Sequence, residues 1–71
     1  MYLNIQNAYE QSQKVTDKLD QLFKVTNTEP NSNGKIVLGT GLLIDKDTLV
    51  SVAKTELKAE GNKLAELIKK L

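Results

Sequence analysis

Apolar side chains recur every three or four residues along two long stretches of the chain, and turn-forming residues separate the two stretches. This spacing places a stripe on one side of an α-helix, because 3.6 residues complete a helical turn. A narrow stripe with heptad a/d spacing is typical of a helix that packs against another helix. The first stretch therefore predicts an amphipathic helix over about residues 2–26. Its series is Ile5, Ala8, Ser12, Val15, Leu19, Leu22 and Thr26, with Met1 one step earlier.

The second series predicts another amphipathic helix, over about residues 48–71. Asp47 is the expected N-cap, and Gly61 is expected to break or bend the helix because glycine costs about 1 kcal/mol relative to alanine. Residues 49–53 are rich in β-branched side chains, so a strand there is the alternative interpretation. The members of the series are Val50, Ala53, Leu57, Glu60, Leu64, Leu67 and Leu71.

The segment between the two stretches carries strong turn chemistry. Glu29-Pro30 ends the first helix, because proline has no amide hydrogen to donate and restricts the residue before it. Turn residues fill about 28–34, and Asn33-Gly34 leads into two short apolar runs separated by glycines. We predict a β-hairpin over about residues 35–44, with a buried extended segment as the alternative. The fold class is therefore α+β, mainly α, in a single small domain spanning residues 1–71.

At 71 residues, the chain has no cysteine and no histidine. Neither a disulfide nor a thiolate or imidazole zinc site can stabilise it, and a core this small seldom supplies more than about 3 to 5 kcal/mol. We therefore expect a homo-oligomer, such as a dimer with four helices. The alternative is a marginal monomer in which Tyr2, Tyr9 and Phe23 fill the gap. The residues expected to form the oligomer or partner interface are Ile5, Val15, Leu19, Leu22, Phe23, Val50, Leu57, Leu64 and Leu67.

The composition argues against an enzyme. No side chain has an unperturbed pKa near neutrality, and cysteine nucleophiles and histidine bases are excluded. Gly39-Thr40-Gly41 starts like a dinucleotide fingerprint, but Ile44 stands where the third glycine belongs. Asp45-Lys46-Asp47 starts like a calcium loop, but Val50 stands where glycine is required. We expect no catalytic residue, no cofactor and no metal site.

Residues 39–54 (GTGLLIDKDTLVSVAK) resemble the first-barrel segment of trypsin-like bacterial serine proteases. The resemblance covers sixteen residues, rests mostly on hydrophobic patterning, and implies a strand over residues 49–53. Lys54 stands at the position of the catalytic histidine, so protease activity is excluded.

All ten basic residues are lysine, and the net charge is only +1. A lysine-only set is typical of AT-rich genomes and indicates a low-GC bacterium or its phage or plasmid. We expect a cytoplasmic or virion-associated, non-enzymatic protein-interaction or assembly protein that does not bind membranes. One alternative is a small nucleic-acid-binding regulator with phosphate contacts at Lys14, Lys18 and Lys24. A second alternative is a protein that sequesters a small anionic ligand in a pocket between subunits, near Gly39 to Gly41 and Lys35, Lys46 or Lys54.

Overall fold

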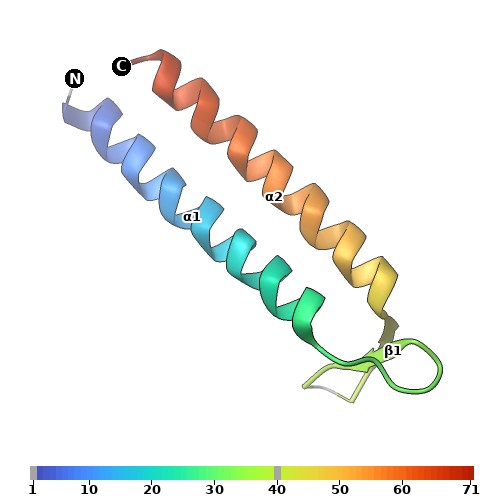
Figure 1. The fold of residues 1–71 in the computed structure, drawn as a ribbon. Coiled ribbons are helices and arrows are strands. Elements are labelled where there is room, and N and C mark those ends of the chain that lie inside the picture. Colours follow the sequence, from blue (N-terminus) through green and yellow to red (C-terminus); the bar gives the residue numbers. More distant parts are fainter. Residues whose placement is uncertain (1, 40) are drawn as a thin grey trace.

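The computed structural model describes residues 2–39 and 41–71, so Met1 and the Thr40 position of the predicted hairpin lie outside it. Helix α1 (Tyr2–Asn27) is followed by strands β1 (Lys35–Val37) and β2 (Leu43–Asp45) and by helix α2 (Lys46–Lys69). The two helices run antiparallel side by side, with both chain termini at one end and the hairpin at the other (Figure 1). The molecule is a rod measuring 52 × 18 × 17 Å. The predicted α+β, mainly α, fold is confirmed.

The last carbonyl groups of helix α1 accept hydrogen bonds from residues that follow the helix. The Thr28 hydroxyl donates to the carbonyl of Lys24, and the Thr28 amide donates to the carbonyl of Val25. The ammonium group of Lys46 donates to the carbonyl of Thr26 at 2.8 Å. A cation at a helix C-terminus also interacts favourably with the helix dipole. The start of α2 therefore caps the end of α1 and ties the two helices together beside the hairpin.

The β1–β2 hairpin is antiparallel, with Ile36 opposite Ile44. Before β1, the Asn31 side chain accepts hydrogen bonds from the amides of Asn33 and Lys35. Gly34 adopts a φ of 76°, a left-handed conformation that glycine accepts without steric cost. The predicted hairpin over 35–44 is confirmed, and its second strand extends to Asp45.

Helix α2 begins directly after β2, and this overturns two predictions. Asp45, rather than Asp47, occupies the N-cap position, and its side chain makes no capping hydrogen bond. The Asp45 carboxylate instead lies 3.0 Å from the Lys35 ammonium across the hairpin. Residues 49–53 are helical, so the strand implied by the protease resemblance is wrong. The helix starts two residues before the predicted residue 48 and ends at Lys69.

The predicted break at Gly61 is also wrong. Helix α2 runs without interruption from Lys46 to Lys69. Glycine in a helix interior costs only about 1 kcal/mol, and the packing of α2 along α1 outweighs that cost.

Few apolar side chains are fully enclosed. Among the described residues, the buried hydrophobic side chains are Ala8 on α1, Ala53 on α2 and Ile36 in the hairpin. Apart from Leu49, the half-buried apolar side chains of α2 follow the predicted series from Val50 to Leu67, whereas Leu71 is exposed. Small alanines let the two helices approach each other, but they remove little apolar surface from water.

Helix α1 meets α2 in a different register from the one predicted. The predicted seam residues Ile5, Leu19 and Thr26 are exposed, which is a correction to the sequence interpretation. Ala8, Val15 and Leu22 belong to both the predicted and the observed seam. At the positions between them, the observed seam residue comes one place earlier in the sequence than the predicted one. The buried and half-buried members of the observed seam are Asn4, Ala8, Gln11, Val15, Lys18, Leu22 and Val25, and Asn7 and the predicted Ser12 are half-buried beside it.

Candidate interaction surface

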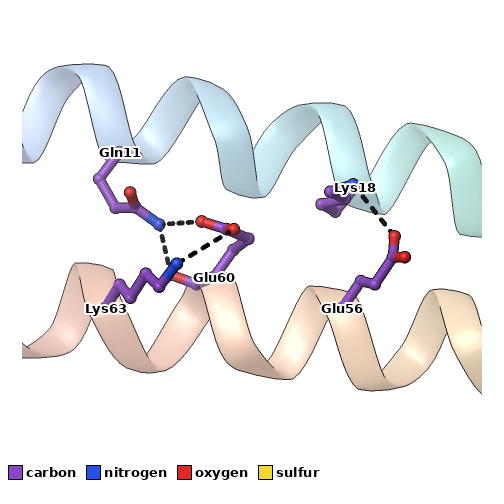
Figure 2. A network of polar contacts seen from close by, with 5 residues as sticks. All are labelled: Gln11, Lys18, Glu56, Glu60 and Lys63. Carbon is purple, nitrogen blue, oxygen red and sulfur yellow. Dashed lines mark hydrogen bonds and ion pairs between the residues drawn. The ribbon is translucent and has the colours of Figure 1, made fainter.

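Polar side chains pair across the two helices and fix the face that α1 turns toward α2 (Figure 2). The Gln11 side chain is only 6% exposed. Its amide nitrogen donates to the backbone carbonyl of Glu60 at 2.9 Å and to the Glu60 carboxylate at 2.5 Å. Further along the seam, the Lys18 ammonium lies 3.0 Å from the Glu56 carboxylate. These contacts require positions 11 and 18 of α1 to face α2.

The Glu60 carboxylate is held in its ionised form at this seam. Its side chain is 18% exposed, and the Lys63 ammonium lies 3.6 Å away. The hydrogen bond from Gln11 is the largest cause that lowers the pKa of Glu60 below its usual 4.5; the nearby charges of Lys63 and Lys14 act in the same direction. Partial burial opposes them. A buried glutamine and a charged glutamate thus form a satisfied polar layer inside the helix pair.

This register leaves a second stripe of large side chains exposed on α1. Tyr2, Ile5, Tyr9, Leu19 and Phe23 are between 51% and 78% exposed. With Ser12 and Thr16 between them, they repeat in alternating steps of three and four residues. At 100° per residue, the stripe is centred roughly 115° around the helix from the seam with α2. We call these seven residues the outer stripe.

The C-terminal half of the outer stripe contains a shallow depression. Thr16, Leu19, Asp20 and Phe23 line an open, mostly apolar hollow on α1. The hollow belongs to the exterior of one helix, and no residue of α2 lines it. Such a surface can receive an apolar side chain from another molecule.

The nine predicted interface residues divide between two faces. Six are half-buried between the helices of the chain: Val15, Leu22, Val50, Leu57, Leu64 and Leu67. Ile5, Leu19 and Phe23 lie on the outer stripe. Sequence reasoning gave Tyr2 and Tyr9 only a role as fillers of a monomer core. A second three-four series beginning at Tyr2 was the signal that could have placed both tyrosines on this face.

The hairpin exposes a smaller apolar group at the far end of the rod. Val37 and Leu43 are paired across the strands, and both are exposed together with Leu42. Each strand has only three residues, so this group offers much less surface than α1.

The lysines predicted to contact anions are partly neutralised. Lys18 pairs with Glu56, and the Lys24 ammonium lies 2.9 Å from the Asp20 carboxylate. Lys14 lies close enough to Glu60 to lower its pKa. At the hairpin, Lys35 pairs with Asp45 and Lys46 donates to the end of α1. Lys18, Lys24, Lys35 and Lys46 therefore all hold partners within the chain.

Within residues 2–39 and 41–71, no group of three or more acidic side chains is arranged to hold a metal ion. No helix in that part of the chain has the length and apolar character needed to cross a bilayer. Comparisons with protein-family models, with curated proteins and with solved structures gave no match.

Proposed function

We propose that the chain is a non-enzymatic assembly protein that works as a homo-oligomer and associates through the outer stripe of α1. The observation that carries this proposal is that small apolar side chains are buried between the helices while large ones are exposed on α1. The buried apolar side chains of the helix pair are two alanines, whereas six large apolar side chains of α1 are exposed, five of them on the outer stripe. A contiguous exposed apolar surface on a small protein marks an interaction site.

The size of the outer stripe supports association. A tyrosine or phenylalanine can bury about 150–250 Å², so the five side chains expose roughly 600 Å² between them. A stable protein interface buries about 800 Å² on each partner. The outer stripe alone therefore supplies most of the surface that an association of ordinary size requires.

The two alternatives receive less support. A nucleic-acid regulator would need lysines that are available to phosphate, but Lys18 and Lys24 already hold ion pairs. A protein that sequesters an anion at the hairpin would need lysines available there, but Lys35 pairs with Asp45 and Lys46 donates to the end of α1. The proposal keeps the protein in the cytoplasm or in a virion.

Light scattering coupled to size-exclusion chromatography tests the proposal at micromolar concentrations. We expect a mass of at least twice 7.9 kDa for the natural chain. Leu19→Lys should shift the mass to that of one chain, because it places a charge in the centre of the association surface. Val52→Lys is the matched control. Val52 is 49% exposed on α2 and Leu19 is 54% exposed on α1, and lysine is a good helix former at both positions.

Circular dichroism at 222 nm should show the same helix content for the natural chain and both variants. A natural chain with the mass of one protomer across the concentration range contradicts the proposal. An oligomer that Leu19→Lys and Val52→Lys weaken equally contradicts the assignment to the outer stripe.

A further inference from the structure

The outer stripe has a symmetric layout along α1. Ile5 and Phe23 each stand nine residues from Lys14, Tyr9 and Leu19 each stand five residues from it, and Ser12 and Thr16 each stand two residues from it. Four of the five large apolar side chains therefore occupy matching positions on both sides of a small, polar centre, whereas Tyr2 is matched by Thr26. Lys14 itself is on neither the outer stripe nor the seam, so it does not obstruct this centre.

We propose that the occupant of the outer stripe is a second copy of the chain, with the two α1 helices packed antiparallel about the level of Lys14. This inference rests on the proposed function and specifies its geometry. A two-fold interface must be self-complementary, so that a residue contacting a second residue is contacted by that second residue of the partner. The symmetric layout of the outer stripe meets this requirement when the helices run in opposite directions.

Antiparallel packing places unlike side chains opposite each other along the outer stripe. Ile5 lies opposite Phe23 of the other copy, and Tyr9 lies opposite Leu19 of the other copy. An aromatic ring then meets an aliphatic side chain at each of these levels. Parallel packing would instead place each ring against the same ring of the other copy and each aliphatic side chain against its own copy, which fills the space between the helices unevenly.

The polar residues that flank the outer stripe also suit an antiparallel pair. Gln6, Gln13 and Asp20 follow the stripe at e-type positions, and flanking e positions meet each other in antiparallel coiled coils. Gln6 would meet Asp20 of the other copy, so that an amide can donate to a carboxylate. Gln13 would meet Gln13 of the other copy, and two amides can exchange hydrogen bonds. No pair of like charges is brought together at these positions.

The absence of cysteine allows a cross-linking test in an otherwise natural chain. A Gln6→Cys chain and an Asp20→Cys chain are mixed in denaturant, refolded together and oxidised. We expect a disulfide between the two different chains, identified by peptide mass spectrometry. In the antiparallel pair, two copies of position 6 lie about 24 Å apart along the helix, whereas a disulfide needs Cα atoms within about 7 Å. Neither variant alone should therefore form a covalent dimer.

A Gln13→Cys chain provides a second test, because it should cross-link to itself beside the two-fold axis. A Val52→Cys chain measures the background from random collisions. Efficient cross-linking of Gln6→Cys to itself overturns the antiparallel arrangement in favour of a parallel one. A dimeric mass with no cross-link above the Val52→Cys background also overturns it. A monomeric mass instead overturns the proposed function itself, so the two failures are distinguishable.

Discussion

Replacing Gly61 with alanine should stabilise the protein, because the glycine lies inside a continuous helix with no close neighbour at its missing Cβ. Helix α2 passes through this position without a break, and a Cβ built at Gly61 has no heavy atom within 4 Å beyond its immediate surroundings. Alanine is about 1 kcal/mol more favourable than glycine in a helix interior. Because the position has room for the methyl group, Gly61→Ala should gain most of that difference.

The expected thermal shift follows from the size of the chain. Unfolding entropy is about 2.1 cal/mol/K per residue near 60 °C, which gives roughly 0.15 kcal/mol/K for a chain of this length. A gain of about 1 kcal/mol therefore raises the midpoint of thermal unfolding by about 7 °C. Circular dichroism measures this shift, with all samples at one protein concentration because oligomer stability depends on concentration.

Ala65→Gly is the matched control for this prediction. Ala65 is an exposed residue of the same helix, so its replacement should lower the midpoint by a similar amount. The double variant should return close to the natural value, because the two substitutions change helix propensity by about the same amount in opposite directions. A lower midpoint for Gly61→Ala would refute the reasoning. It would mean that α2 bends at Gly61 or that another chain approaches this backbone closely.

Two further predictions concern the polar contacts of the seam. The lowered pKa of Glu60 means that its contribution to stability is fully present above its usual pKa of 4.5 and is lost as the pH falls through its lower value in the folded state. Gln11→Ala should make the urea midpoint less sensitive to pH between 7 and 3, and an unchanged dependence would contradict the role of Gln11. For the partly exposed Lys18–Glu56 pair, a double-mutant cycle should give a coupling of about 0.2–1 kcal/mol that disappears in 1 M salt. A coupling well above this range would mean that the pair is more strongly desolvated than the structure shows.

The elements of the fold were predictable because local signals and tertiary packing agree. The three-four series predicted both helices, and the Asn33-Gly34 turn with the flanking apolar runs predicted the hairpin. The errors lie at boundaries and at single residues. Asp47 has a suitable side chain for an N-cap, but β2 leads directly into α2 and places Asp45 there. Gly61 has an intrinsic preference against helix that is smaller than the gain from packing α2 along α1.

The register of α1 could not be predicted from apolar spacing alone. Ala8, Val15 and Leu22 belong to both registers, so they do not distinguish the two. The other positions are Ser12, Leu19 and Thr26 in the predicted register, and Gln11, Lys18 and Val25 in the structure, where Ser12 is half-buried beside them. Polar partners on α2 decide between them, because Gln11 meets Glu60 and Lys18 meets Glu56. The pairing of these partners depends on how far the hairpin offsets one helix along the other, which no pattern within α1 encodes.

The same register explains why an assembly would stop at a defined size. Because polar pairs turn part of the polar face of α1 toward α2, the largest side chains of α1 form a separate outer stripe. Helix α2 has no equivalent stripe, since its large apolar side chains other than Val52 and those near its C-terminal end lie along the seam. The described part of each chain therefore offers one large apolar surface of this kind. A single self-complementary surface closes on itself as a dimer, whereas two different surfaces would allow open chains to grow.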